Sequence, residues 1–352
     1  NGSDDTGDGS IELPFSSIQW ALKETSHADT IRIMPGTYYE HSFSNYDPQS
    51  TQPQSTGRFD LTIVGMNSTG EVIVDAQKNN RHMMINGGFN PDMQISMTFR
   101  NIHFTNGEGR DEDGFNGGGS IYLAKITAKF VNCHFSNNQA TAGVGGWSPG
   151  GAINIYSSTV KIISCTFEDN FSQIRGGAIN IDWYDENDEV DVEIINSTFT
   201  RNDVQINDGE QMSALGGAIY FGGSRNLRLK IQDSIFSDNR VRNNNSGQGC
   251  AGGVIGSMGQ DPHDDWSNIE PVIIDRNIFM DNGCDCGPGT WAGGSVIDVG
   301  WNIDISNSLF AQNYTQSNDG ISGFVIRHSP QVAGAEMTMV NNTIVRNQLR
   351  NQ

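Results

Sequence analysis

Short apolar segments recur along the whole chain, and glycine, asparagine or serine separates them. Residues 152–155 and 160–163 show the pattern, with apolar side chains interrupted by one polar residue. Segments of this length and composition are typical of β-strands. They return in units of roughly 30 to 40 residues, and such a period predicts a repeat architecture. A unit this short cannot bury its own apolar face, whereas stacked units can.

One recurring phrase is Gly-Gly followed by a small residue and an apolar residue. Its copies stand at residues 118–121, 150–153, 176–179, 216–219, 252–255 and 293–296, with a degraded copy at 320–326. A glycine pair allows the chain to turn sharply before the next strand.

The second phrase is Phe-x-x-Asn, and it alternates with the glycine pairs. Its copies are Phe135/Asn138, Phe167/Asn170, Phe199/Asn202, Phe236/Asn239, Phe279/Asn282 and Phe310/Asn313, with the variant Ile344/Asn347 and an imperfect copy at Phe104. Equivalent residues of stacked coils lie about 4.8 Å apart. We therefore expect an internal stack of phenylalanines and a ladder of asparagines. We also expect the ladder asparagines to adopt the left-handed conformation that the turns need.

These patterns predict a right-handed single-stranded parallel β-helix that forms one domain over residues 1–352. Leucine-rich and helical solenoids need patterns that are absent here, and a β-propeller needs about four strands in each longer blade. We expect two or three strands in each unit. We divide the domain into an N-terminal cap and first coil (1–40), irregular coils (41–117) and the repeat coils (118–352).

The N-terminal region predicts a cap for the core. Residues 14–23 read as a short amphipathic helix that would cover the first coil. Strand, turn and strand follow over residues 29–40, and further strands are expected at 61–64, 72–74, 83–85 and 95–99. The chain ends after a full repeat with no evident cap. We expect another chain, or residues beyond this sequence, to cover that end.

Acidic residues outnumber Lys and Arg by 41 to 21, which gives a net charge of −20. Such a charge repels phosphate backbones, so we do not expect a nucleic-acid partner. No stretch is apolar enough to span a bilayer, so direct membrane insertion is not expected either. The acidic surface suits extracellular solubility and could bind Ca²⁺ as its one candidate cofactor, although simple solvation explains it equally well. Residue 1 is expected to be a mature N-terminus, because no signal peptide precedes it.

Two insertions, at residues 182–189 and 261–266, combine carboxylates with aromatic rings. Both fall between a glycine pair and its phenylalanine, so we expect them on the same side of the helix. They could bind Ca²⁺ or stack on a sugar, or be solvated turns or packing contacts. Their candidate residues are Asp182, Trp183, Tyr184, Asp185, Asp188, Asp264, Asp265 and Trp266. A third acidic cluster stands at residues 111–113, at another turn.

The five cysteines fall into two groups. Cys133 and Cys165 hold the same position in adjacent repeats, where stacking would allow either a disulfide or a pair of free thiols. Cys250, Cys284 and Cys286 precede successive glycine pairs, and a disulfide from Cys250 to Cys284 or Cys286 would join neighbouring loops. No set of Cys and His shows the paired spacing of a zinc site.

Asparagine sequons would permit N-glycosylation in a secretory route. Besides the one at Asn1, the candidates are Asn67, Asn170, Asn196, Asn244, Asn313 and Asn341.

The two phrases resemble the repeats of the chlamydial polymorphic outer-membrane proteins over residues 118–347, which implies an adhesive or structural role at a surface. The opening of the chain also carries a resemblance, through Asp8-Gly9, Pro14-Phe15, Ile18-Gln19, Ala21, and residues 29–31 and 35–38. These positions look like the start of pectate-lyase-like β-helix proteins. That superfamily includes polysaccharide lyases and hydrolases as well as noncatalytic members, so the fold alone assigns no chemistry.

The sequence therefore favours a non-enzymatic extracellular or cell-surface protein. It would act as an adhesin, or as a structural subunit of an appendage, filament or layer that associates with itself or with other surface proteins. The alternative is a polysaccharide lyase, a glycoside hydrolase or a carbohydrate-binding module. A lyase needs basic side chains, and Arg225, Arg228 and Lys230 form the best basic group. A hydrolase needs paired carboxylates, which Asp182, Asp185, Asp264 and Asp265 could supply.

Overall fold

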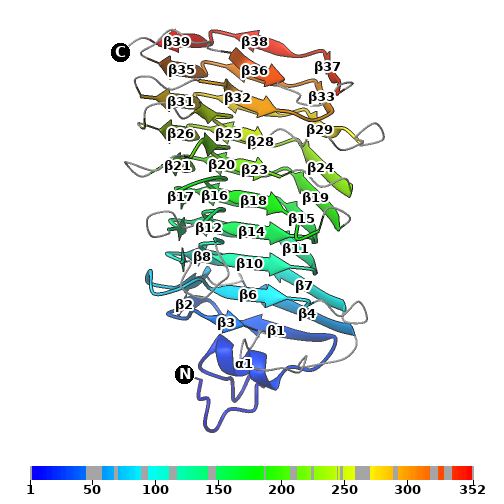
Figure 1. The fold of residues 1–352 in the computed structure, drawn as a ribbon. Coiled ribbons are helices and arrows are strands. Elements are labelled where there is room, and N and C mark those ends of the chain that lie inside the picture. The colour runs from blue at the N-terminus through cyan, green and yellow to red at the C-terminus, as the bar shows by residue number, and fades with distance from the viewer. Residues whose placement is uncertain are drawn as a thin grey trace.

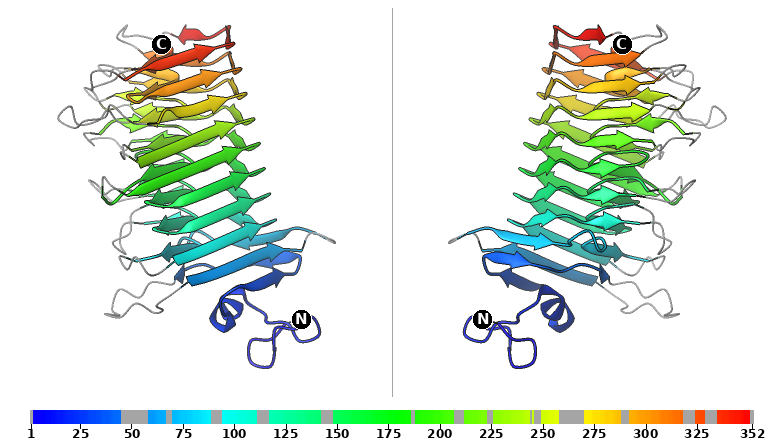
Figure 2. Two further views of the ribbon diagram at one scale, coloured as in Figure 1. Left: turned by 90° about the vertical axis from the view of Figure 1, so that its right-hand side faces the viewer. Right: turned by 90° about the vertical axis from the view of Figure 1, so that its left-hand side faces the viewer.

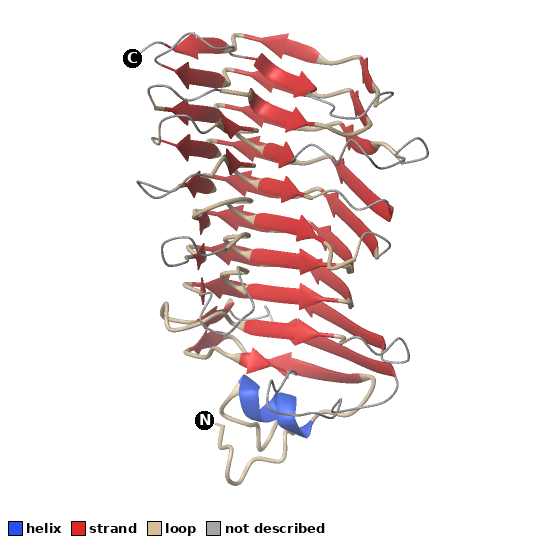
Figure 3. Ribbon diagram, viewed as in Figure 1, coloured by secondary structure: helices blue, strands red, loops and turns tan. Residues whose placement is uncertain are grey.

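The chain coils into a single elongated stack of parallel strands that rises from an N-terminal helix (Figures 1 and 3). The computed structural model describes residues 2–44, 58–66, 70–88, 94–110, 117–141, 148–185, 188–206, 212–222, 226–243, 245, 249–257, 270–287, 292–317, 324–328 and 335–350. Every strand pairing within these residues is parallel, and each joins a strand to its equivalent in the next coil. The predicted parallel β-helix is confirmed.

Most described coils contribute strands to four sheets, named here A, B, D and C in chain order. Sheet A contains β1 (Asp29–Ile33), β4 (Arg58–Gly65), β7 (Gln94–Arg100), β11 (Thr127–Val131), β15 (Thr159–Ile163), β19 (Glu189–Ile195), β24 (Asn226–Gln232), β29 (Val272–Asp275), β33 (Ile303–Ser306) and β37 (Met337–Val340). Sheet B contains β2 (Gly36–Tyr38), β5 (Val72–Asp75), β8 (His103–Thr105), β12 (His134–Ser136), β16 (Thr166–Glu168), β20 (Thr198–Thr200), β25 (Ile235–Ser237), β30 (Ile278–Met280), β34 (Leu309–Ala311) and β38 (Thr343–Val345).

The other two large sheets complete each coil. Sheet D contains β9 (Glu108–Gly109), β13 (Gln139–Ala140), β17 (Phe171–Ser172), β21 (Asp203–Gln205), β26 (Arg240–Asn243), β31 (Gly283–Cys286), β35 (Tyr314–Ser317) and β39 (Gln348–Arg350). Sheet C contains β3 (Phe43–Ser44), β6 (Met83–Asn86), β10 (Ile121–Ala124), β14 (Ile153–Tyr156), β18 (Ile179–Asp182), β23 (Ile219–Phe221), β28 (Ile255–Ser257), β32 (Gly294–Val299) and β36 (Phe324–His328). The expectation of two or three strands in a unit is therefore wrong, because the short strands of sheet D add a fourth.

The phenylalanines of the second phrase form the predicted internal stack. Along sheet B, the rings of Phe135, Phe167 and Phe199 lie 4.9 and 4.7 Å apart with nearly parallel planes. The stack continues through Phe236 and Phe279 with centroid distances of 4.8 and 5.0 Å. All of these rings are fully buried. Strand alternation explains this burial, because each phenylalanine is the middle residue of a three-residue strand whose neighbours point outward.

The asparagines form the predicted ladder. The side-chain amide of Asn170 donates to the carbonyl of Phe135 in the coil below, at 3.0 Å. Oδ1 of Asn170 accepts from the backbone N–H and the side-chain amide of Asn138, at 3.1 and 3.0 Å. The same bonds recur at Asn202, through the carbonyl of Phe167. The ladder therefore satisfies backbone groups at a buried corner of the described repeat coils, from Asn138 to Asn347.

The left-handed residue of this corner precedes the ladder asparagine. Asp169 and Arg201 have φ values of 54° and 53°, while Asn170 and Asn202 do not have positive φ. The expectation that the ladder asparagines are left-handed is wrong for a steric reason. Their side chains must point inward to reach the coil below, so the bend falls on the preceding residue, whose side chain points out to solvent.

The N-terminal cap is confirmed. Helix α1 (Ile18–Glu24) lies below the first coil (Figure 2), and its Ile18 is buried. Ser17 is the N-cap and accepts from the N–H of Trp20 at 3.1 Å. The Glu40 carboxylate accepts from the N–H groups of Ile18 and Gln19, at 2.8 and 2.9 Å. These bonds satisfy backbone donors that a helix start leaves open.

A second, smaller apolar cluster lies beside the main core, between sheet D and the two short strands of sheet E, β22 (Ala214–Leu215) and β27 (Cys250–Ala251). Val204 and Val241 of sheet D pack in this cluster, and a disulfide joins Cys250 to Cys286 across it. This pairing is one of the two that the sequence left open. Cys284 is a free, buried thiol.

Cys133 and Cys165 are also free thiols, so the alternative of a disulfide between them is wrong. They belong to a second buried ladder, two residues before each stacked phenylalanine. The N–H of Cys133 points to Sγ of Cys165 at 3.4 Å, and the N–H of Cys165 donates to Oγ of Ser197 at 3.1 Å. Sγ of Cys165 therefore accepts a bond of the kind that the Ser197 hydroxyl accepts one coil higher.

The last described coil leaves its inward positions exposed. Met339 and Ile344 occupy the places that buried residues hold in earlier coils, yet their side chains are exposed. Among the described residues there is no helix long and apolar enough to cross a membrane.

Candidate functional site

The acidic–aromatic insertion after β18 packs its tyrosine onto the outer face of sheet C. The ring of Tyr184 stacks on Tyr156, with centroids 4.9 Å apart and planes inclined by 19°. Tyr122, one coil lower, lies 5.6 Å from Tyr156, and its hydroxyl forms a hydrogen bond with the hydroxyl of Tyr184. We call these three residues, from three successive coils, the tyrosine platform. Tyr122 is buried, Tyr156 is half-buried and Tyr184 is 41% exposed.

Charged side chains lie against the tyrosine platform. Nζ of Lys125 lies over the ring of Tyr184, 5.9 Å from its centre, and 3.6 Å from a carboxylate oxygen of Asp188. Asp188 also accepts from the hydroxyl of Ser157 at 2.6 Å and from the N–H of Asp185 at 3.1 Å. Ser157 in turn accepts from the N–H of Tyr184 at 3.0 Å. These bonds join the described residues on either side of the insertion and hold the Tyr184 ring in place.

Asp182 is a titratable residue of the insertion whose pKa is shifted by its surroundings. It ends β18, in register with Tyr156, and accepts from the N–H of Trp183 at 3.1 Å. Burial raises the pKa of Asp182 to about 6, although the hydrogen bond and the charge of Arg175 oppose the increase. A carboxyl group in this range can exchange a proton near neutral pH.

The predicted residues of the first insertion therefore have different roles. Tyr184 forms the exposed surface, Asp188 holds the turn together and Asp185 is exposed. Trp183 is half-buried against the main core, so its ring does not offer the sugar-stacking face expected for it. The reason is that the residue after Asp182 turns inward at the end of the strand.

The second insertion, with Asp264, Asp265 and Trp266, lies outside the described residues, as do residues 111–113. The strands that flank the two insertions are described. One connection runs from β18 to β19 and the other from β28 to β29, so both join sheet C to sheet A. A common side for both insertions remains a prediction.

The predicted basic group is held by carboxylates. Within β24, the Arg228 guanidinium lies 3.5 Å from Asp191, and Nζ of Lys230 lies 3.9 Å from Glu193. Both carboxylates belong to the strand one coil lower, β19. These cation–carboxylate pairs are cross-strand contacts of an outer sheet face. Arg225 lies outside the described residues.

Two glycosylation candidates are incompatible with the folded structure. Asn170 and Asn313 are ladder residues whose side-chain amides are fully buried and hydrogen bonded. Asn196 and Asn341 are exposed, at left-handed turn positions with φ values of 50° and 55°. Asn67 and Asn244 lie outside the described residues.

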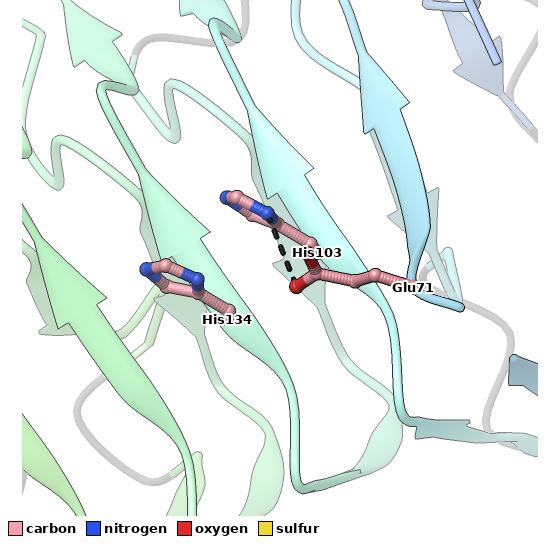
Figure 4. A group of neighbouring side chains, drawn as sticks. All are labelled: Glu71, His103 and His134. Carbon is pink, nitrogen blue, oxygen red and sulfur yellow. Dashed lines mark ion pairs between the residues drawn. The ribbon is translucent and has the colours of Figure 1, made fainter. Parts of the chain in front are cut away.

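A second cluster was not predicted from the sequence. Among the described residues, one group of at least three His, Cys, Asp or Glu side chains converges closely enough to hold a metal ion: Glu71, His103 and His134 (Figure 4). The two histidines are paired in register on β8 and β12, one residue before the stacked Phe104 and Phe135. Because neighbours on a strand face opposite sides, the phenylalanines point inward and the histidines outward.

The imidazoles of His103 and His134 stack with centroids 4.0 Å apart and planes inclined by 14°. Nδ1 of His103 lies 3.4 Å from Oε1 of Glu71, and Nε2 of His134 lies 3.4 Å from Oε2 of Glu168. Burial, reinforced by His134, lowers the pKa of His103 to about 4. The sequence signal for this cluster was the common position of both histidines relative to the repeat.

No protein-family model matches the chain, and no curated protein is similar to it in sequence. Two solved structures resemble the fold. A rhamnogalacturonan lyase is 12% identical, with a TM-score of 0.31, and the match covers 97% of this chain and 86% of the lyase. The A-module of a mannuronan C-5 epimerase from Azotobacter vinelandii is 11% identical, with a TM-score of 0.24 and coverage of 92% and 88%.

Proposed function

We propose that the chain is an extracellular adhesive β-helix that binds a neutral glycan on the outer face of sheet C without turning it over. The observation that carries this proposal is the tyrosine platform, because Tyr184 presents an exposed ring that its neighbours hold in position. A fixed aromatic ring offers contact area at little cost in conformational entropy, and its apolar face can pack on the C–H face of a sugar. Lys125, whose ammonium lies over the Tyr184 ring, and its partner Asp188 offer polar groups for the sugar hydroxyls.

The charge of the chain supports a neutral ligand. At a net charge of −20, the protein would repel a polyanionic polysaccharide at distances shorter than the Debye length, where salt screens the charges least. The described basic residues of the best basic group already pair with carboxylates. An extracellular location is supported by the Cys250–Cys286 disulfide, because such bonds persist in oxidising compartments. Association with other surface proteins, or assembly into a filament or layer, remains an expectation.

A glycoside hydrolase is the second candidate, and the raised pKa of Asp182 favours it. General acid catalysis needs a carboxyl that keeps its proton near neutral pH. Hydrolysis also needs a second carboxyl on the other side of the scissile bond, roughly 5 to 9.5 Å away. Asp182 supplies only one member of such a pair.

Isothermal titration against soluble neutral and acidic polysaccharides tests the proposal. The wild type should bind at least one neutral glycan, and Tyr184→Ala should weaken that binding at least tenfold. Tyr39→Ala is the matched control, because Tyr39 is 64% exposed and lies outside the tyrosine platform. Equal binding by Tyr184→Ala and the wild type, or tighter binding of polyanions, would overturn the proposal. Release of reducing ends that Asp182→Asn abolishes would establish the hydrolase instead.

A further inference from the structure

We propose that Glu71, His103 and His134 form a binding site for a divalent transition metal of the zinc class on the outer face of sheet B. This site is independent of the glycan proposal, because its two histidines lie on sheet B and Glu71 directly precedes β5 of that sheet, whereas Tyr122 and Tyr156 of the tyrosine platform lie on sheet C. It was not apparent from the spacing of cysteines and histidines along the chain.

The donor atoms already lie close together. One ligand atom from each residue lies within 4.8 Å of the other two. A tetrahedral zinc ion with bonds of about 2.0 to 2.1 Å holds its ligand atoms about 3.4 Å apart. Nδ1 of His103 and Oε1 of Glu71 show this separation, at 3.4 Å. Small side-chain movements would bring the ring nitrogen of His134, the third donor, to the same ion.

The outer nitrogen of His103 is held as metal-binding imidazoles usually are. Nε2 of His103 forms a 2.7 Å hydrogen bond with the hydroxyl of Ser136. A hydrogen-bonding partner of this kind fixes ring orientation and increases the basicity of the other nitrogen. Nε2 of His134 lies 3.4 Å from the carboxylate of Glu168 and forms no hydrogen bond among the described residues. Nδ1 of His103 is buried and has no hydrogen-bond partner, so a ligand-binding atom is left available toward Glu71.

Metal binding should change the stacking of the rings. The two imidazoles are nearly parallel, so their in-plane lone pairs are also nearly parallel and do not meet at one point. Rotation about the Cβ–Cγ bonds would tilt the rings toward a shared ion. The Glu71 side chain is 57% exposed and can follow this movement.

The donor set selects the class of ion. Imidazole nitrogen suits Zn²⁺, Cu²⁺ and Ni²⁺, whereas Ca²⁺ takes six to eight oxygen ligands. Two histidines and one carboxylate leave a fourth tetrahedral position for water or for a ligand. The site therefore discriminates against the Ca²⁺ that an acidic surface would otherwise collect.

Titration calorimetry of chelator-treated protein with Zn²⁺, in excess Ca²⁺ to occupy weak carboxylate sites, tests the proposal. One equivalent should bind, and His103→Gln and Glu71→Gln should each weaken binding at least tenfold. His27→Gln is the matched control, because it removes an exposed histidine outside the cluster. Circular dichroism verifies the fold of each variant.

A second readout separates coordination from loss of structure. Co²⁺ added to the wild type should give the visible absorption of a nitrogen- and oxygen-ligated ion, and histidine ring resonances should shift as the stack opens. Glu71→Gln alters a mostly exposed side chain, so its effect on Zn²⁺ is not an effect on folding. Wild-type affinity in both Glu71→Gln and His103→Gln, or no preference for Zn²⁺ over Ca²⁺, would overturn the proposal.

Discussion

The side-chain amide of Asn170 donates a 2.9 Å hydrogen bond to Oδ1 of Asn202, which lies 32 residues later and one coil higher. That same oxygen accepts the backbone N–H of Asn170 at 3.2 Å. Asn202 then uses its own amide to bond the carbonyl of Phe167, at 3.0 Å. One asparagine therefore satisfies three buried groups of the neighbouring coil.

Replacing Asn202 with alanine should lower the free energy of unfolding by about 3 kcal/mol, because buried partners left without a hydrogen bond cost about 1 to 3 kcal/mol each. Urea unfolding followed by circular dichroism measures the change. Thr198→Ala, on the outward side of the same coil, should change it by less than about 0.5 kcal/mol. Equal effects of the two substitutions would show that the ladder does not contribute to stability.

Phe199 stacks between Phe167 and Phe236, at 4.7 and 4.8 Å. Phe199→Ala should lower the free energy of unfolding by about 3 to 5 kcal/mol, because a buried cavity remains. Ile344 occupies the equivalent position in the last described coil but is 50% exposed. Ile344→Ala should therefore cost less than about 1 kcal/mol. A loss at Ile344 as large as that at Phe199 would mean that its side chain is covered in solution.

Stability should fall in acid through His82. Its Nε2 lies 2.9 Å from the carbonyl of Val74 and its Nδ1 lies 3.0 Å from the hydroxyl of Ser120, an arrangement that suits the neutral ring. Burial lowers the pKa of His82 to about 4. In the unfolded chain the value is about 6.5. Between these values the unfolded state binds more protons, so the stability that His82 contributes is present above pH 6.5 and is lost as the pH falls toward 4.

This loss amounts to about 3 kcal/mol at most. The difference in unfolding free energy between the wild type and His82→Gln, measured from pH 7.5 to 4, isolates the effect from the many carboxylates. The wild type should lose more stability than the variant over this range. Parallel pH profiles would mean that His82 protonates equally well in the folded protein.

The disulfide between Cys250 and Cys286 closes a loop of 36 residues. Loop-closure entropy predicts that its removal costs about 3 to 4 kcal/mol. Unfolding of the double variant Cys250→Ala/Cys286→Ala measures this cost. Cys165→Ser is the comparison, because Ser197 fills the same ladder position one coil higher and the substitution should be nearly neutral. A double variant as stable as Cys165→Ser would contradict the prediction.

The main features of the fold could be predicted because identical side chains recur at identical positions. Phe167 and Phe199 reveal the stack, and Asn170 and Asn202 reveal the ladder, without knowledge of the backbone. The short strands of sheet D could not be predicted, since two residues such as those of β13 show no alternation. The sequence favours Asn170 for the left-handed turn because asparagine tolerates that conformation, but Asp169 adopts it, since the side chain of Asn170 must point inward.

The candidate sites were harder to predict because their residues come from different coils. Tyr122, Tyr156 and Tyr184 meet only after three coils are stacked, and nothing in the local sequence of the insertion indicates its partners. His103 and His134 share a repeat position, but the contact with Glu71 depends on the coil before them. The alternation of residues within a strand predicts which side chains point inward. Which side chains of neighbouring coils come into contact can be predicted only when the register between all the coils is known.

The ladder also bears on how such a chain can change length. Each ladder asparagine donates from its side-chain amide to Oδ1 of the asparagine in the coil above, and its own Oδ1 accepts from the asparagine in the coil below. The bonds are the same whether successive ladder residues are 31 or 43 positions apart in the chain. Extra residues are accommodated between strands and leave the corner unchanged. A whole coil could therefore be duplicated or excised at the level of the gene, and the new neighbours would already match. Because the bonds between coils are the same along the ladder, longer and shorter forms of the protein could evolve by gain or loss of whole coils.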